Sequence, residues 1–417
     1  MFFWLFLWIP LLVVCTGWSA QAIAVAMQAR KFSRRVARPP HEGFDAYQPP
    51  ATVIVPFKGH DDDLPRHLRA LVTQDYAEYR LILVFEDQED PARRAIELEL
   101  EQNKIKPPVD IVIAGLAPDD TGQKVHNQLA ALAHLEAVGD TSEVWAFADS
   151  DAVPGSGWLR KLVAPLADPT RIGVTTGYRW LMPELRAQRP TTPSMFASVI
   201  NSSVATLIGH GTLAQAWGGS MAVRADFARE HGLTDNYLRG SLSDDYQMTR
   251  MCRDASKRLY FVTHCLVPSP VRFTWREFFE FGRRQYLITR AHDQALYKKA
   301  VAAIGFYLLA NVSCVVGLIA ALPSEEWGVA IYAGATLLTV GVANQFRAFY
   351  RRRAIAAAFG RDQLRYLRHT VRLDRFGTFV VMAVNLTLLL SAARGKRLTW
   401  RGNTYELNGP QSIRRLP

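Results

Sequence analysis

The first 27 residues contain no charged side chain, and this constrains the fold more than any other feature of the chain. The run Met1–Met27 consists mainly of Leu, Ile, Val, Ala, Phe and Trp. At about 1.5 Å per helical residue, it is long enough to cross a hydrocarbon core about 30 Å thick. A cleaved signal peptide is the alternative, but such peptides carry a basic segment before a shorter apolar core. We therefore predict an uncleaved transmembrane anchor over residues 1–27.

Basic residues follow this anchor directly. They are Arg30, Lys31, Arg34, Arg35 and Arg38. Cations beside a membrane span stay on the cytoplasmic side. The amino terminus is then expected outside, and the domain over residues 28–298 is expected to face the cytoplasm. The protein is predicted to be membrane-bound, in the plasma membrane or, if bacterial, the inner membrane.

The chain is basic, with 49 Lys and Arg against 38 Asp and Glu and a net charge of +11. Many of the cations flank apolar segments, as in residues 347–353 and 393–401. Basic clusters at such places more often contact anionic lipid headgroups than nucleic acid. We therefore expect a membrane and no nucleic acid as a partner. The four cysteines show no spacing typical of a zinc site or a disulfide framework.

Residues 299–417 read as a C-terminal membrane region. Two apolar arms joined by PSEE predict a transmembrane hairpin over 300–343, and the basic stretch 346–375 predicts a juxtamembrane helix. A third, shorter apolar segment covers 376–393 and precedes a basic tail. Counting three spans from a cytoplasmic domain would place that tail outside, against the charge rule. Either the third segment is re-entrant, or the charge rule fails here.

The region between the membrane segments has the pattern of an α/β domain. Strand-like apolar runs at 51–57, 79–86, 109–115 and 144–148 alternate with helical patterns. Such alternation predicts a mainly parallel sheet, whose ligands collect at the carboxyl ends of the strands. Acidic clusters follow three of these four runs. The fold class expected is therefore an α/β domain with a ligand site, combined with transmembrane helices.

One acidic cluster, Asp149-Ser150-Asp151, places two carboxylates on the turn after the fourth strand. Oxygen ligands of this type suit Mg²⁺ or Mn²⁺, which also bind phosphate oxygens. A metal held there could neutralise a diphosphate leaving group. The alternative is a capped turn at the end of a strand.

A second cluster, Glu86 to Asp90, follows the second strand. An acid at this place in a nucleotide-binding sheet commonly binds a ribose hydroxyl or a base amide. A solvated acidic turn is the alternative.

A third pair, Asp244 and Asp245, precedes an amphipathic helix. It is either a helix N-cap or a general base whose pKa is raised by its acidic neighbour. A cationic stretch follows at 278–290, where Arg283, Arg284 and Arg290 either clamp phosphates or lie on lipid headgroups.

Together these segments resemble the family 2 and family 21 glycosyltransferases of GT-A fold, above all the ceramide glucosyltransferases and their bacterial relatives. The likeness runs nearly from end to end. The matching segments are VPFKG (55–59), Gln74-Asp75-Tyr76, EDQEDPA (86–92), Lys124 with Asn127, ADSD (148–151), SDDY (243–246) and TWRGNTYEL (399–407).

The resemblance implies a set of site residues. Its catalytic pair would be Asp245, as the base, and Asp244. Its metal ion, Mg²⁺ or Mn²⁺, would be bound by Asp149 and Asp151. The residues implied for binding the nucleotide-sugar donor are Pro56, Lys58, Asp87, Asp90, Lys124, Asp149, Arg283, Arg284, Gln285 and Tyr286.

The chain departs from the family pattern in two places. The signature (Q/R)-x-x-R-W is expected near residue 286, where this chain reads Gly282-Arg283-Arg284-Gln285-Tyr286. An aromatic residue is kept and the arginines come earlier, which indicates a shifted role for Arg284 and leaves the acceptor open. The chain also has a complete Asp-x-Asp, where the animal ceramide enzymes keep only the first acid.

The function implied is a membrane-bound inverting glycosyltransferase. It would move a hexose from a nucleotide sugar, UDP-glucose or similar, to the hydroxyl of a lipid that is ceramide-like, a diacylglycerol or another lipid alcohol. A processive polysaccharide synthase would carry the Q-x-x-R-W helix and more spans. A non-catalytic scaffold would not need intact acids, and a protein that only binds nucleic acid or a lipid surface would not need three acidic clusters at strand ends.

Overall fold

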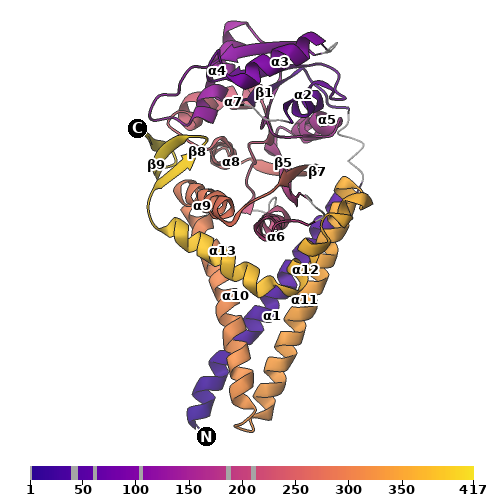
Figure 1. Cartoon of the computed structure of the whole chain (residues 1–417), viewed down its shortest axis with the longest axis vertical. Coiled ribbons are helices and arrows are strands. Elements are labelled where there is room, and N and C mark those ends of the chain that lie inside the picture. Colours follow the sequence, from indigo (N-terminus) through magenta and orange to yellow (C-terminus); the bar gives the residue numbers. More distant parts are fainter. Residues whose placement is uncertain (1, 39–45, 60–62, 103–106, 185–188, 208–212) are drawn as a thin grey trace.

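The computed structural model describes residues 2–38, 46–59, 63–102, 107–184, 189–207 and 213–417, so Met1 of the predicted anchor lies outside it. A layered sheet domain stands above three long helices that pack side by side (Figure 1). The helices and helical turns of the sheet domain are α2 (Leu64–Val72), α3 (Pro91–Gln102), α4 (Gln123–Ala137), α5 (Trp158–Val163), η1 (Ala164–Ala167), α6 (Thr192–Leu207), α7 (Ala225–Glu230), η3 (Leu233–Leu238), α8 (Asp244–Asp254) and α9 (Trp275–His292). Its strands are β1 (Ala51–Pro56), β2 (Tyr79–Phe85), β3 (Val109–Ile113), β4 (Val144–Ala148), β5 (Ile172–Pro183), β6 (Ser220–Arg224) and β7 (Arg258–Val271). The other elements are α1 (Phe2–Ala37), α10 (Gln294–Ala321), α11 (Trp327–Phe359), η4 (Arg361–Arg365), α12 (Arg368–Phe376), α13 (Thr378–Ala393), β8 (Arg397–Trp400), β9 (Asn403–Gly409) and β10 (Ser412–Leu416).

The strands of the sheet domain form one sheet in the order β3-β2-β1-β4-β6-β5-β7. Among these described strands, only β6 runs antiparallel to its neighbours, β4 and β5. Helices cover both faces, so the central strands are continuous apolar runs rather than alternating ones. Along β1, Val53 and Val55 pack into one core cluster and Ile54 into the other. The predicted α/β class with a mainly parallel sheet is thereby confirmed.

One edge of this sheet gathers the segments that carry the acids. The carboxyl ends of β1, β2 and β4 lie together there because these strands are parallel. β6 runs the other way, so its first residue, Ser220, pairs with Ala148 at the end of β4. β5 and β7 remain paired as far as Pro183 and Val271, well beyond the part of β5 that pairs with β6. The edge is thus flanked by a two-stranded wall.

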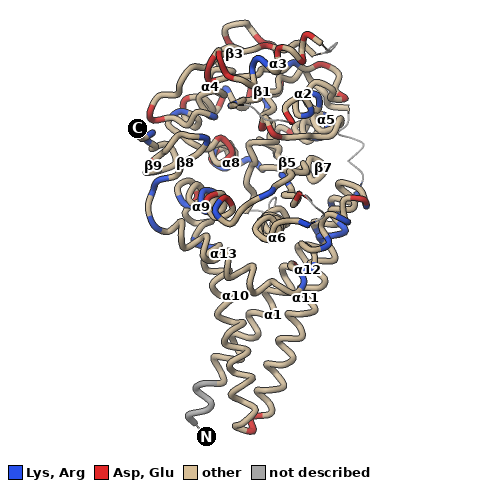
Figure 2. The backbone as a smooth tube through the Cα atoms, in the orientation of Figure 1, with Lys and Arg blue, Asp and Glu red and all other residues tan. Residues whose placement is uncertain are grey.

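Among the described residues, three helices are long and apolar enough to cross a membrane: Trp8–Ala37 within α1, and the whole of α10 and α11. Trp18 of α1 packs edge-to-face on Tyr307 of α10, with ring centroids 5.6 Å apart. Figure 2 shows the lower part of this bundle almost without charge, whereas basic residues gather where the bundle meets the sheet domain. The predicted combination of an α/β domain with transmembrane helices is therefore borne out.

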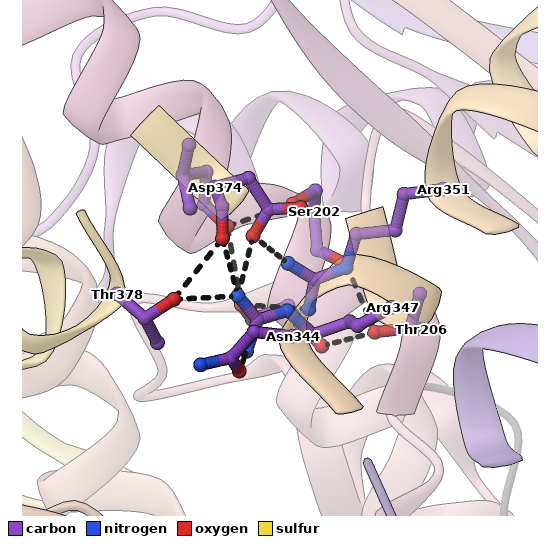
Figure 3. Close-up of polar contacts among 9 residues, drawn as sticks. Ser202, Thr206, Asn344, Arg347, Arg351, Asp374 and Thr378 are labelled. Atoms are coloured by element: carbon purple, nitrogen blue, oxygen red, sulfur yellow. Dashed lines mark hydrogen bonds and ion pairs between the residues drawn. The ribbon is translucent and has the colours of Figure 1, made fainter. Parts of the chain in front are cut away.

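The polar end of α11 differs from the expectation that the hairpin ends at residue 343. The helix continues to Phe359, and the stretch 346–375 is divided among the end of α11, η4 and α12. Two arginines of this part of α11 belong to a buried ionic cluster (Figure 3). Asp374 Oδ1 of α12 lies 3.0 Å from Arg347 Nη2 and 2.8 Å from Arg351 Nη1, and Arg351 also donates to Ser203 of α6 at 3.0 Å. These arginines pair inside the protein and do not end the helix.

The C-terminal elements turn back toward the sheet domain. α12 and α13 meet at Gly377 with a bend of 89°, and α13 lies across the lower side of α9 (Figure 1). The chain then forms a three-stranded antiparallel sheet, β8–β10, over the part predicted only as a basic tail. This small sheet contacts the sheet domain: the backbone amide of Arg415 donates to the carbonyl of Asp119, in the loop between β3 and α4, at 2.6 Å.

Candidate active site

Four of the six predicted acids, Asp149, Asp151, Asp244 and Asp245, line one pocket at the sheet edge described above. The pocket has a volume of about 580 Å³. It is lined by the ends of β1 and β4, the starts of α4 and α8, one side of α9 and the turn between β8 and β9. A larger hollow of about 850 Å³ lies beside α2, but none of the predicted site residues lines it. The pocket at the sheet edge is therefore the candidate active site.

Lys124, at the start of α4, joins two of the pocket's acids. Its Nζ atom lies 2.7 Å from Asp149 Oδ1 and 3.1 Å from Asp244 Oδ2. Burial alone would lower the pKa of Lys124, but the two carboxylates outweigh it and the pKa is raised. Burial would likewise raise the pKa of Asp149, yet Lys124 holds that pKa below its usual value. Lys124 and Asp149 therefore form a fixed ion pair at neutral pH.

Asp245, the second acid of α8, is partly buried in the pocket wall. Its Oδ1 atom accepts from the Ser243 hydroxyl and from the amide of Tyr246, the latter at 2.7 Å. Burial, and then the charge of Asp244, raises the pKa of Asp245 to about 6. A carboxyl group with a pKa near the operating pH suits a general base. A simple helix cap explains the pair less well, because Asp244 is bonded to Lys124 of α4.

Two glycines before β6 allow the backbone to pass close to these acids. A Cβ atom on Gly218 would lie 2.6 Å from both Asp244 Oδ2 and Lys124 Nζ. A Cβ atom on Gly219 would lie 2.6 Å from Asp149 Oδ2. Contacts this short do not occur in folded proteins, so a larger residue at either position would displace the charged groups.

The residues predicted at the ends of β1 and β2 are only partly in the pocket. Pro56 and Lys58 line it, and Lys58 Nζ pairs with Glu86 at 2.8 Å. Asp90 is buried outside the pocket lining, and its carboxylate accepts from a backbone amide of the loop after β1 at 3.1 Å. Asp87 is exposed and also lies outside the lining. Asp90 therefore holds the loop after β1 in place, and Asp87 lies beside it. Of the charged residues predicted in this part of the site, Lys58 is the one that lines the pocket.

The predicted phosphate-binding stretch of α9 is divided. Arg284 and Gln285 line the pocket. Arg283 and Arg290 instead donate to main-chain carbonyls between the end of α13 and β8. Tyr286 donates its hydroxyl hydrogen to an asparagine of α13. Arg284 of this motif thus lines the pocket, whereas Arg283, Tyr286 and Arg290 bind α9 to the C-terminal part of the chain.

Three arginines that line the pocket, Arg66, Arg179 and Arg401, were not among the predicted site residues. Arg179 of β5 lies over the rings of Trp217 and Phe281, 5.9 and 5.3 Å from their centroids. Arg401, in the turn between β8 and β9, donates to the carbonyl of Lys58 at 2.9 Å. The segment TWRGNTYEL held a signal for Arg401, since it matches a family motif. No local pattern marks Arg179, because β5 reaches the pocket only through its pairing with β7.

Asp149 and Asp151, at the end of β4, are the residues that could hold a metal ion. Among the described residues, no group of three or more His, Cys, Asp or Glu side chains forms a complete cation site. Mg²⁺, however, is commonly bound by one or two carboxylates together with substrate phosphates and water. Asp151 is exposed to the pocket and Asp149 directs one oxygen to Lys124. This donor set fits an ion that binds together with a phosphate-bearing substrate.

Comparison with known proteins places the chain in a family. The sequence profile of glycosyl transferase family 21 matches residues 16–413. A search of curated proteins gave no match.

Among solved structures, a mannosyltransferase from Pyrobaculum calidifontis in complex with GDP-Man and Mn²⁺ covers 92% of this chain and 97% of its own, at 17% identity and a TM-score of 0.48. A glucosyl-3-phosphoglycerate synthase from Mycobacterium tuberculosis in complex with phosphoglyceric acid covers 60% and 84%, at 14% identity and a TM-score of 0.38. The family match includes every residue of the pocket. The protein belongs to glycosyl transferase family 21 and is a glycosyltransferase.

Proposed function

We propose that the protein transfers a hexose from a nucleotide sugar, UDP-glucose or a similar donor, to the hydroxyl group of a membrane lipid with inversion at the anomeric carbon. One observation carries this proposal. Asp245, whose pKa is raised to about 6, shares a pocket with Asp149 and Asp151, and that pocket has apolar lining residues that pack in one cluster with α13. The base, the phosphate-side acids and a lipid-compatible surface are thus within one site.

In this proposal the donor lies along the ends of β1 and β4. Lys58 and the loop after β1 bind the nucleoside, and Asp149 and Asp151 lie at the diphosphate. A Mg²⁺ or Mn²⁺ ion bound by these two acids would neutralise the charge of the departing nucleotide diphosphate. Lys124 holds Asp149 in place through the 2.7 Å ion pair. Arg284, at the pocket wall, adds positive charge on the phosphate side.

The chemical step is a single displacement. Asp245 takes the proton from the acceptor hydroxyl while that oxygen forms a bond to the anomeric carbon. The bond from this carbon to the diphosphate oxygen breaks, and the nucleotide diphosphate leaves with the electron pair. Because attack and departure occur on opposite faces, the anomeric centre inverts. Asp244 pairs with Lys124 and orients the start of α8.

One part of the pocket lining is apolar and packs toward α13, which supports a lipid acceptor. It contains Leu181, Val271, Phe273, Phe281 and Ile288. The first four pack in the same hydrophobic cluster as residues of α13. On its other side α13 exposes large apolar side chains, which suit contact with lipid. A ceramide-like lipid, a diacylglycerol or another lipid alcohol could present its hydroxyl from this side.

We also propose three spans, with the catalytic domain in the cytoplasm. The last turn of α1 carries Arg34 and Arg35, and the carbonyl of Arg38, directly after it, contacts His264 of β7 in the sheet domain. By the positive-inside rule this end of α1, and the domain beside it, lie in the cytoplasm. The sheet β8–β10 packs on the catalytic domain, so α12 and α13 must return to the same side. The 89° bend at Gly377 supports a re-entrant or interfacial pair rather than a fourth span. Three spans also argue against a processive synthase, which needs more of them to line a pore.

The test uses the purified full-length protein in lipid nanodiscs that contain ceramide, diacylglycerol or a hopanoid alcohol. Each preparation receives Mn²⁺ and a labelled nucleotide hexose. The proposal predicts a glycolipid whose anomeric configuration is opposite to that of the donor. Retention of configuration, or transfer only to water or to a growing polysaccharide, would refute it.

A further inference from the structure

The C-terminal sheet β8–β10 is attached to the segments that form the pocket. Arg401 donates to a carbonyl in the loop after β1 at 2.9 Å. The Tyr405 hydroxyl accepts from the first amide of α4 at 3.3 Å, and the carbonyl of Pro410 accepts from a glutamine of α8 at 2.7 Å. The sheet therefore bridges the nucleoside side of the pocket, the lysine helix and the base helix.

The turn between β8 and β9 is an unusual place for an arginine. Trp400 pairs with Asn403, which leaves a turn of two residues, Arg401 and Gly402, with φ angles of 46° and 84°. Turns with positive φ at both central residues favour Asn, Asp or Gly at the first of them. Any Cβ atom there approaches the following carbonyl, and only Asn and Asp offset this cost through local hydrogen bonds of their short polar side chains, which Arg cannot form. The backbone conformation of the turn does not favour arginine at position 401. We therefore look for the role of Arg401 in the contacts of its side chain.

Its side chain joins a group of cations in the pocket. Arg179, Arg284 and Arg401 come from β5, α9 and the β8–β9 turn. Arg284 lies between the rings of Phe281 and Trp400, 5.5 Å from each centroid. Within the described residues, none of the three arginines forms a salt bridge, unlike Lys58 and Lys124 in the same pocket. Burial, followed by the charges of the other two arginines, lowers the pKa of Arg284 to about 10. Cations that repel one another in this way are stabilised by a bound anion.

The surroundings indicate which anion this is. Arg401 touches the loop that we assign to the nucleoside, and Arg179 and Arg401 line the same pocket as Asp149, the acid assigned to the metal-bound phosphates. The group that lies between a nucleoside and a metal-binding acid is the diphosphate. We infer that Arg401 binds the diphosphate group of the donor, with Arg284 beside it, and that the C-terminal sheet is thereby part of the catalytic apparatus. This inference rests on the proposed function.

The test compares Arg401→Asn with the wild type and with Arg397→Asn. Asparagine suits the left-handed turn position, so Arg401→Asn removes the cation without straining the backbone and should not lower the melting temperature. Arg397 lies on β8 with an exposed side chain and provides the matched control. UDP binding to the full-length protein in detergent with Mn²⁺ is measured by calorimetry, and uridine binding is measured by competition.

Arg401→Asn should weaken UDP binding by about tenfold or more, which is the effect of losing a hydrogen bond to a charged group. Uridine binding and the KM for the lipid acceptor should change little, and the donor KM should rise. Arg397→Asn should match the wild type, and Arg401→Lys, which keeps the charge but not the forked donors, should lie between.

Unchanged UDP binding in Arg401→Asn would overturn the inference. So would a rise in the acceptor KM alone, because the arginine would then serve an acceptor headgroup. If the wild type bound neither UDP nor GDP, the proposed function itself would fail. The wild-type binding measurement alone gives this result, so it is distinguished from a failure of the inference about Arg401.

Discussion

Replacing Asp245 with asparagine should abolish transfer while making the protein more stable above pH 6. The pKa of Asp245 rises from 3.8 to about 6 through burial and the neighbouring charge of Asp244. At about 1.4 kcal/mol per pKa unit, keeping this carboxylate ionised costs the folded state up to about 3 kcal/mol. The cost is absent near pH 4, grows as the pH rises toward 6, and is complete above it. Asparagine carries no charge and can still accept from Ser243 and Tyr246.

The assay has two readouts. Loss of a general base typically lowers the rate by about 10²- to 10⁴-fold, so Asp245→Asn should transfer almost no sugar, yet still bind UDP with Mn²⁺. In the wild type, transfer should fall as the pH drops below about 6, since the base becomes protonated. The melting temperature of Asp245→Asn should exceed that of the wild type at pH 8 but not at pH 4. Asp244→Asn should lower stability instead, because Lys124 loses a partner.

Wild-type transfer by Asp245→Asn would refute the role of Asp245 as the base. A gain in melting temperature of equal size at both pH values would refute the electrostatic reasoning, because a cost that arises from ionisation must depend on pH.

Three further predictions concern the metal, the topology and the buried ionic cluster. Asp151→Asn should lower turnover by well over tenfold with the fold intact, and EDTA should do the same to the wild type; full activity in excess chelator would contradict the metal. Cysteines introduced at Ser324 and Ser156 should label from opposite faces of sealed vesicles, and labelling of both from one face would overturn the orientation. Asp374→Asn should destabilise the protein by about 3–5 kcal/mol, because it leaves two buried arginines without their acid, whereas the exposed Asp362→Asn is the control and should change the melting temperature little.

Local patterns in the sequence were sufficient to predict the sheet and the acids at its edge. β4 is a buried apolar run that is followed directly by the acidic residue Asp149. This change from apolar to acidic residues can be seen in the sequence without any tertiary information. Parallel strands then bring such ends together, so the acids after β2 and β4 could be predicted to lie at one edge of the sheet from periodicity and one topological rule. Asp245 stands at the start of a helix, and only its match to a family motif placed it with them.

The partners of those acids could not be predicted in the same way. Lys124 bridges Asp149 and Asp244, and this pairing depends on how α4 packs against α8. Arg351 resembles a charge that ends a membrane span, yet it is buried against Asp374 of a later helix. The turn at Arg401 reaches the pocket only because α13 bends back beneath the sheet domain. Each case is a contact between segments that are far apart in the sequence. The local pattern of apolar and charged residues in one segment does not specify which distant segment will pack against it.

The central claim, that this pocket passes a hexose from a nucleotide to a lipid, is tested most directly in membranes. Membranes containing the wild type or Asp245→Asn are incubated with labelled UDP-glucose and Mn²⁺, and the lipid extract is analysed by mass spectrometry. The account predicts a lipid carrying one added hexose in the wild-type extract only, and its loss when the divalent ion is chelated. A labelled lipid of equal amount in both preparations, or label found only in water-soluble or polymeric products over a panel of UDP- and GDP-hexoses, would contradict it.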